Sequence, residues 1–167
     1  MGPARGYFLD PTKSILVVAE RNVPRAKEYF RGMGVQFITG SRHLGGFIGE
    51  QEAEDQWIQS KVEGWAESVR KLAGVARKHP KSTHAGLQKS LQEELEFVQR
   101  VTPEIGEAFV PVEEEIAKAF LPELFEGVGD GAPGRAITRL PVKQAGMALP
   151  DPTLTAPENW QASCVIT

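Results

Sequence analysis

Arg-His-Leu-Gly-Gly-Phe-Ile-Gly, residues 42–49, separates two kinds of sequence pattern and decides the predicted fold. Before it, short β-branched runs flank one helical segment. After it, apolar residues recur at helical spacing through most of the chain. Glycines beside apolar residues are typical of a tight turn into an edge strand. We therefore predict that residues 42–49 form a third strand, at the point where a small sheet gives way to helices.

The residues before this stretch predict a strand, a helix and a second strand. Residues 15–18, Ile-Leu-Val-Val, are typical of a strand buried on both faces. Asn22 is a candidate cap for a helix that has Pro24 in its first turn, where the missing N–H costs nothing. Glycines at 32 and 34 would end that helix. Residues 35–38 then predict the second strand, which completes the order strand, helix, strand, turn, strand.

Three helices are predicted after this stretch, over residues 51–79, 82–101 and 103–124. Each carries an apolar stripe with steps of three and four residues, which indicates a buried face. His79-Pro80 would end the first helix, and Ser82 or Thr83 could cap the second. Thr102-Pro103 would end the second helix, and Pro111 would divide the third. The stripe residues are Ile58, Val62, Trp65, Val69, Leu72 and Ala76, then Leu87, Leu91, Leu95 and Val98, then Ile105, Phe109, Val112, Ile116, Phe120 and Leu124.

These patterns predict an α+β fold that is mostly α. A partial sheet with one helix would occupy residues 1–50, and an antiparallel helical bundle would occupy residues 51–127. Residues 128–167 are rich in proline and glycine and predict a mostly irregular segment. A short docking helix is expected around Ile137–Leu140, and a small helix could form over the last ten residues.

The net charge of −3 argues against a protein that coats nucleic acid along its whole surface. The distribution is uneven: residues 1–50 carry seven Lys/Arg and four Asp/Glu (+3), and residues 51–167 carry twelve and eighteen (−6). A polyanionic partner would therefore favour the N-terminal third. No apolar run approaches the roughly 20 residues of a membrane span, and the N-terminus lacks a secretory signal. With Cys164 as its only cysteine, the chain is expected to be intracellular, in the cytoplasm or nucleus.

No familiar catalytic constellation stands in the sequence. The serines lack a Gly-x-Ser-x-Gly setting, and the histidines lack metal-ligand spacing. Glu113-Glu114-Glu115 and Glu93-Glu94 are predicted as solvated helix faces. A small-molecule enzyme that uses glutamates remains open, although no acid–base pair can be named for it.

The order of the motifs along the chain allows a more specific interpretation. A Gly-Tyr-Phe-x-x-Pro-x-Lys-Ser segment leads into the first strand, and x-Leu-Gly-x-x-Ile-Gly precedes the long Trp-bearing helix. In this order the chain resembles the C-terminal part of a reverse transcriptase, an RNA-directed DNA polymerase, from a eukaryotic retrotransposon-like element. Residues 6–18 resemble the palm motif after the catalytic aspartates, and residues 42–49 resemble the primer-grip hairpin. The similarity continues through Trp65, residues 85–87, 97–103, 140–141, 144–146 and 151–153, and the ending 163–167.

The resemblance implies the end of a palm followed by a thumb. Lys13 stands at the motif's lysine and would supply charge to the incoming triphosphate, or a proton to the leaving pyrophosphate. Nucleic-acid binding would fall to Arg42, His43, Leu44, Gly45 and Gly46, the glycines allowing a sugar-phosphate backbone to come close. His43 replaces the aromatic residue of many relatives, which puts stacking in doubt. Thumb contacts to the duplex backbone would come from Lys61, Arg70, Lys71, Arg77, Lys78 and Lys81.

The resemblance also implies what the chain lacks. The complete family enzyme holds Mg²⁺ with aspartates of an aromatic-x-Asp-Asp motif, and no such motif occurs in this sequence. The chain is therefore expected to hold no metal or other cofactor and not to polymerise alone. Its expected partners are an RNA/DNA primer–template and the remaining palm and fingers, and no membrane. Without those parts, the strands would expose edges and apolar surface. The alternative is a helical protein-interaction module without nucleic-acid function.

Overall fold

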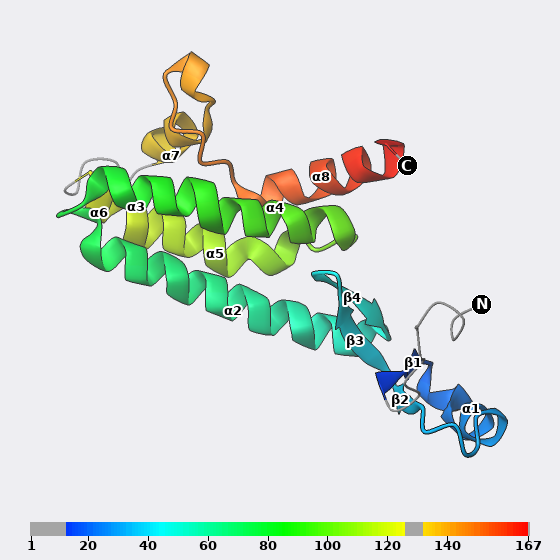
Figure 1. Cartoon of the computed structure of the whole chain (residues 1–167). Helices are drawn as coiled ribbons and strands as arrows, with labels where there is room; N and C mark the ends of the chain where they lie inside the picture. The colour runs from blue at the N-terminus through cyan, green and yellow to red at the C-terminus, as the bar shows by residue number, and fades with distance from the viewer. Residues whose placement is uncertain (1–12, 126–131, 167) are drawn as a thin grey trace, which may run out of the picture. The chain divides into compact units, whose positions relative to one another are not determined.

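A computed structural model describes residues 13–125 and 132–166 of the chain (Figure 1). The predicted motif residues 6–12 lie outside this part. The chain divides into two compact units, Met1–Trp57 and Ile58–Thr167. Helices dominate the described residues, and the strands form two small two-stranded sheets. This confirms a fold that is α+β and mostly α.

The first unit begins with the predicted strand–helix–strand order. β1 (Ile15–Val17) is followed by α1 (Val23–Tyr29) and β2 (Gln36–Ile38), and the two strands pair in parallel. Pro24 lies in the first turn of α1 as expected. The predicted cap is wrong, because Asn22 makes no side-chain capping bond. It already has helical dihedral angles, and it ends the short 3₁₀ turn Glu20–Asn22.

Residues 42–49 lie in a hairpin, the form that the resemblance implied, rather than in the single strand that the local pattern predicted. β3 (Gly40–His43) pairs antiparallel with β4 (Gly46–Gly49), and Arg42 lies opposite Phe47. Leu44 and Gly45 have φ angles of 48° and 90°, so both residues of the turn are left-handed. Such a turn matches the twist of the flanking strands, but it is typical of Asn-Gly. Leucine at its first position is why the sequence pattern did not predict it.

The first unit lacks buried side chains among residues 13–57. The prediction that residues 15–18 form a strand buried on both faces is therefore wrong. The reason is that, within the described residues, β1 pairs only with β2, and Ile15 stays 53% exposed. The expectation of exposed apolar surface is confirmed. The large apolar side chains exposed in this unit are Ile15, Tyr29, Phe30, Met33, Leu44 and Ile48.

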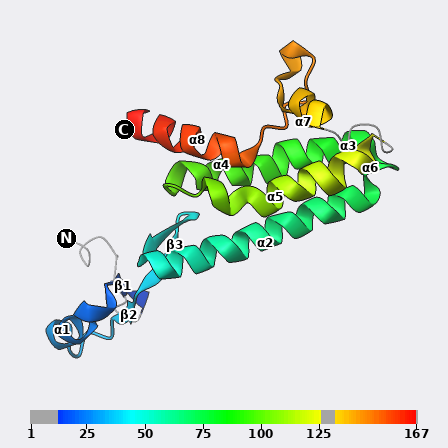
Figure 2. The ribbon, with the colours of Figure 1, turned by 180° about the vertical axis from the view of Figure 1, so that it is seen from behind.

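Three antiparallel helical segments make up most of the second unit (Figures 1 and 2). The first is α2 (Gln51–Ala76), whose initial residues belong to the first unit. The second joins α3 (Pro80–Gly86) to α4 (Gln92–Val101) through a π-helical turn at Leu87–Leu91. The third passes from a 3₁₀ turn, Gly106–Phe109, into α5 (Val110–Glu115), a second π-helical turn (Ile116–Phe120) and α6 (Leu121–Leu124).

The breaks between these segments agree with the sequence in all but one respect. Thr102 is extended and ends α4, and Pro111 lies in the first turn of α5. The predicted capping by Ser82 or Thr83 is wrong, because the second segment already begins at Pro80. The Thr83 hydroxyl instead donates to the carbonyls of His79 and Pro80.

The apolar stripes meet in one core, as the periodicity predicted. The rings of Trp65 and Phe109 stack with their centroids 5.8 Å apart, and Phe109 is completely buried. Leu72, Ile105 and Leu124 are only partly buried. The buried stripe residues are Ile58, Val62, Trp65, Val69 and Ala76, then Leu87, Leu91, Leu95 and Val98, then Phe109, Val112, Ile116 and Phe120.

The C-terminal region is more helical than predicted. α7 (Ala132–Arg139) and α8 (Pro152–Ile166) replace most of the expected irregular segment, with a 3₁₀ turn at Val142–Gln144 between them. Pro152 occupies the first position of α8, where no N–H is needed, and Pro157 lies inside the helix. Asp151 caps it: Oδ1 accepts hydrogen bonds from the backbone N–H and the hydroxyl of Thr153, at 2.9 and 2.6 Å.

Candidate nucleic-acid interface

The structure brings the predicted binding residues together at the tip of the β3–β4 hairpin. Arg42 and His43 end β3 with exposed side chains, Leu44 and Gly45 form the turn, and Gly46 begins β4. Their proximity follows from the short turn. The tip therefore presents a guanidinium, an imidazole and an apolar side chain beside two glycines.

Lys13 belongs to a different place in the first unit. It lies two residues before β1 with an exposed side chain, and β1 pairs with β2 rather than with the hairpin. The structure thus leaves Lys13 outside the sheet that carries the other predicted binding residues.

Leu44 is the most unusual residue of the hairpin. Its φ of 48° places a side chain with a Cβ in the left-handed region, at a cost of about 1–2 kcal/mol. The side chain is 87% exposed, so burial does not offset this cost. Strained residues cluster at binding and catalytic sites, because the strain is part of how such sites are shaped. The tip is therefore the strongest candidate contact site in the first unit.

The base of the hairpin is held in place by packing on α2. The Phe47 ring stacks on Trp57 with centroids 5.7 Å apart. A Cβ at Gly40 would collide with the Phe47 ring, so only glycine fits beneath it. The Glu50 carboxylate accepts a 3.0 Å hydrogen bond from the Glu20 backbone N–H. These contacts fix the direction in which the tip projects from its unit.

Acidic groups lie near the hairpin base as well. Burial raises the pKa of the Glu54 carboxyl in the first turns of α2, and the adjacent Asp55 raises it further. Gln51 donates a hydrogen bond to Asp55. At the tip of the hairpin, the positive charge is the guanidinium of Arg42. Attraction of a polyanion to the hairpin would therefore depend on that residue.

The helical cations that the resemblance assigned to the thumb are mostly paired with carboxylates. A hydrogen bond from Lys71 lowers the pKa of the Glu67 carboxyl. Lys78 and Lys81 are exposed and have no ion pair within the part of the chain that the structure describes. A nucleic acid would have to displace the carboxylates of the others. The pairs are Lys61–Glu94 (2.6 Å), Arg70–Glu115 (2.8 Å), Lys71–Glu67 (2.9 Å) and Arg77–Glu123 (3.6 Å).

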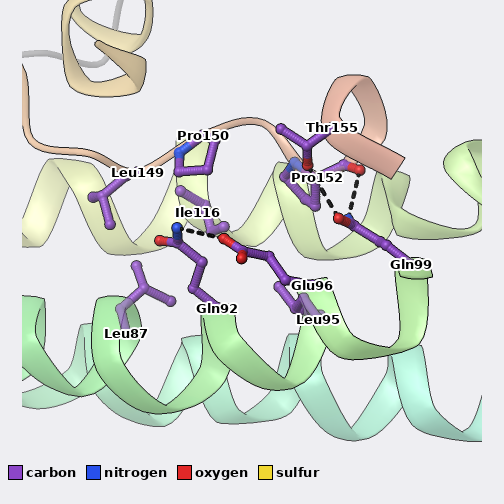
Figure 3. A pocket seen from close by; sticks show the side chains of 10 residues that line it. All are labelled: Leu87, Gln92, Leu95, Glu96, Gln99, Ile116, Leu149, Pro150, Pro152 and Thr155. Atoms are coloured by element: carbon purple, nitrogen blue, oxygen red, sulfur yellow. Dashed lines mark hydrogen bonds between the residues drawn. The ribbon is translucent and has the colours of Figure 1, made fainter. Parts of the chain in front are cut away.

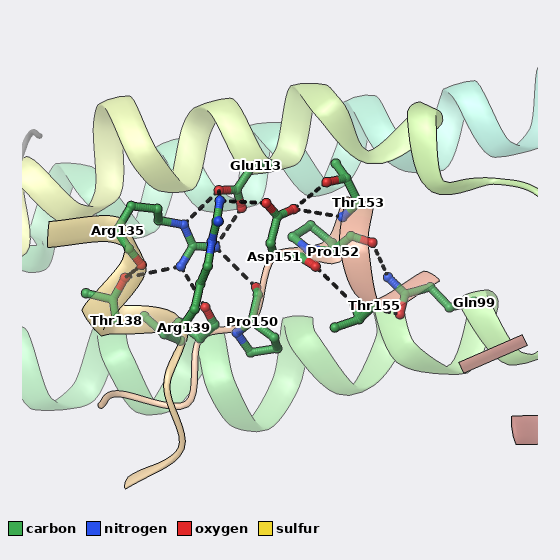
Figure 4. A network of polar contacts seen from close by, with 11 residues as sticks. Gln99, Glu113, Arg135, Thr138, Arg139, Pro150, Asp151, Pro152, Thr153 and Thr155 are labelled. Atoms are coloured by element: carbon green, nitrogen blue, oxygen red, sulfur yellow. Dashed lines mark hydrogen bonds and ion pairs between the residues drawn. The ribbon is translucent and has the colours of Figure 1, made fainter. Parts of the chain in front are cut away.

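A buried ionic network is the main polar feature that the sequence did not predict (Figure 4). Glu113 was expected on a solvated face, but its side chain is only 15% exposed. It accepts two hydrogen bonds from Arg135, at 2.6 and 2.7 Å, and one from Arg139 at 3.0 Å. Arg139 also reaches Asp151 at 2.6 Å. The network ties α7 and the start of α8 to α5. No spacing rule relates these distant residues, so the sequence carried no signal for it.

A small cavity lies between α4, the second π-helical turn and the segment before α8 (Figure 3). Leu87, Ile116 and Leu149 form part of its wall, with Gln92, Glu96 and Gln99 contributing polar groups. Its volume of about 20 Å³ holds one water molecule and excludes an organic substrate. Within residues 13–125 and 132–166, no three His, Cys, Asp or Glu side chains come together as a metal site.

Comparison of the chain with protein-family models, curated proteins and solved structures found no match. Among the described helices, none combines the length and the apolar character that crossing a membrane requires.

Proposed function

We propose that the chain is part of a retroelement reverse transcriptase and that its β3–β4 hairpin positions primer–template nucleic acid. The strand–helix–strand order, the hairpin and the long helix that follows support this proposal. The observation that carries it is the strained and exposed tip, in which Arg42, His43 and Leu44 follow one another in the chain.

Each group at the tip has a physical role in this proposal. The Arg42 guanidinium contacts a phosphate with a forked pair of donors. Gly45 and Gly46 let a sugar-phosphate backbone come close, because they have no Cβ. Leu44 packs against a sugar, and His43 adds a polar contact beside it. Such contacts hold the nucleic acid in register without reading its sequence.

The first unit is proposed to be completed by further palm and finger segments. Its described residues include no buried side chain, and Ile15, Met33 and Ile48 are each more than half exposed. Apolar surface of this kind is usual at an interface. The catalytic carboxylates would come from the added segments, so this chain positions nucleic acid but does not polymerise by itself.

Replacing Arg42 by alanine is expected to weaken binding to an RNA/DNA primer–template by roughly three- to tenfold at low salt. The slope of log K against log[salt] should fall by about 1, because one phosphate contact is lost. Fluorescence anisotropy with a labelled primer–template, across a salt series, measures both quantities. Arg31→Ala is the matched control, since Arg31 is an exposed cation of the same unit outside the hairpin. If the wild-type chain does not bind at low salt, or if both variants behave alike, the hairpin is not the binding site.

A helical protein-interaction module is the second candidate. The ion pairs of Lys61, Arg70 and Arg77 favour it, because they leave the bundle with few uncommitted cations. The same salt series separates the two candidates, since an interaction module would not bind the primer–template at any salt concentration.

A further inference from the structure

The segment between α7 and α8 projects from the helical bundle in both views of the ribbon (Figures 1 and 2). We call the last turn of α7 together with the residues that follow it, residues 137–148, the knob. Its two arms are joined by backbone hydrogen bonds, from Ala148 N–H to the Leu140 carbonyl (2.9 Å) and from Gly146 N–H to the Pro141 carbonyl (3.2 Å). A Cβ at Gly146 would collide with the Leu140 carbonyl. Backbone hydrogen bonds and close packing thus give the knob a defined conformation.

Contacts with the bundle fix the base of the knob. Arg135 is buried and donates to the carbonyls of Leu149 (2.6 Å) and Pro150 (3.2 Å), which follow the knob in sequence. His84 donates from Nε2 to the Met147 carbonyl at 3.0 Å. A projection fixed in this way loses little conformational entropy when it binds.

The knob displays apolar side chains at its surface and carries backbone strain. Ile137, Leu140 and Val142 are 56%, 39% and 67% exposed, and the exposed Lys143 follows them. Ala145 and Ala148 have φ angles of 61° and 51°. Strain and exposed apolar surface on one projection indicate a contact surface. A complementary binding site for the apolar side chains and Lys143 of the knob would be an apolar groove with carboxylates at its edge.

A groove elsewhere in the same helical unit has that chemistry. It lies where the turn after α4 meets the start of α8, and it has a volume of about 480 Å³. Val110 and Pro157 supply exposed apolar surface, and Glu104 and Glu107 supply carboxylates. Glu104 has a φ of 53°, so the groove also contains a strained residue. The described residues with a Cβ and positive φ thus fall at the hairpin tip, in the knob and at this groove.

We propose that the knob of one chain docks into the groove of a second copy. Val142 would lie against Val110 and Pro157, and Lys143 would pair with Glu107 across the edge. Charge and apolar character are complementary, and a volume of 480 Å³ accommodates side chains of this size. Since the two surfaces differ, the contact is heterologous, and each chain offers one knob and one groove. A contact formed by so few residues is small, so the association is weak and depends on concentration.

Charge reversal tests the pairing with two single variants of the full chain. Lys143→Glu alters the knob, and Glu107→Lys alters the groove. We expect the wild-type mass in sedimentation velocity to rise between about 1 µM and 1 mM, and each variant to associate at least about tenfold more weakly. A mixture of the two variants should recover the association, because the intact knob of one chain meets the intact groove of the other and the two reversed charges are again opposite. Lys89→Glu and Glu63→Lys, which reverse exposed charges elsewhere, should behave like wild type.

Site-directed cross-linking distinguishes the contact between knob and groove from association through other apolar surfaces. Val142→Cys and Val110→Cys are placed in separate chains that also carry Cys164→Ser. Under mild oxidation, a disulfide dimer should form when the two chains are mixed and not from either alone. Circular dichroism verifies that each variant is folded. A wild-type chain that stays monomeric throughout, a mixture of charge variants that does not dimerise, or equal cross-linking in the unmixed chains would each overturn the proposal.

Discussion

Replacing Glu113 by alanine is expected to destabilise the helical unit by about 3–5 kcal/mol, the cost of leaving a buried charge without its partner. The Arg135 side chain is only 7% exposed, and two of its donors end on the Glu113 carboxylate. Arg139 loses a partner as well, and its Nε already has none among the described residues. Urea unfolding of the full chain, followed by circular dichroism at a helical wavelength, measures this loss.

Glu114→Ala is the matched control for this prediction. Glu114 is the next residue, and its side chain is 56% exposed and pairs with Lys118. An exposed pair contributes at most about 1 kcal/mol, so this variant should stay close to wild type. Replacing Glu113 by leucine together with Arg135 by methionine should cost less than Glu113→Ala alone, because no charge is then left unpaired. Equal stability of the Glu113 and Glu114 variants would show that the network does not hold α7 and α8 on the bundle.

Replacing Phe109 by alanine should also destabilise the helical unit by about 3–5 kcal/mol. Phe109 is completely buried, and its ring stacks on Trp65 at the meeting point of two apolar stripes. The substitution removes that stacking and leaves a cavity that the surrounding helices can fill only in part. Urea unfolding measures the change, and the tryptophan fluorescence of the folded protein should change because Trp65 loses its neighbour.

Phe97→Ala provides the comparison, since Phe97 is 42% exposed on α4. The Phe97→Ala substitution should lower the free energy of unfolding by less than half as much, because the Phe97 side chain buries less apolar area in the folded protein. Two Phe→Ala variants of similar stability would contradict the position of the core between these helices.

Periodicity predicted the helical bundle well. The stripe residues Val62, Leu95 and Phe120 are buried as expected, because three- and four-residue steps place them on one helix face. The break before Pro80 and the end of α4 before Thr102 were also predictable, since proline restricts its own residue and the one before it.

Local sequence patterns do not predict three features of the structure. A leucine in the left-handed turn at residue 44 has no sequence signature, so the local pattern predicts one strand where the structure has a hairpin. The prolines in residues 128–167 suggested irregular structure, although Pro152 suits a helix start. The Glu113–Arg135 network joins residues far apart in sequence, and only the folded chain places them together.

The resemblance implied a hairpin at residues 42–49, which the structure contains, and the binding role of its residues stays a prediction. The resemblance selected Arg42 through Gly46, and the structure places them at one hairpin tip. It also selected Lys13, which precedes a different sheet. Sequence order alone does not specify which strands pair, and this is why the relation between Lys13 and the hairpin could not be predicted.

Photo-cross-linking from residue 44 tests the proposed role of the hairpin most directly. A photoreactive phenylalanine analogue replaces Leu44, whose 87% exposure leaves room for it, and the chain is irradiated with an RNA/DNA primer–template in which each strand carries a different label. The same analogue at Tyr29, an exposed position on α1, is the control. The proposal predicts cross-links from residue 44, concentrated near the primer 3′ end and lost at high salt. Equal labelling from both positions, or no labelling from residue 44, would contradict it.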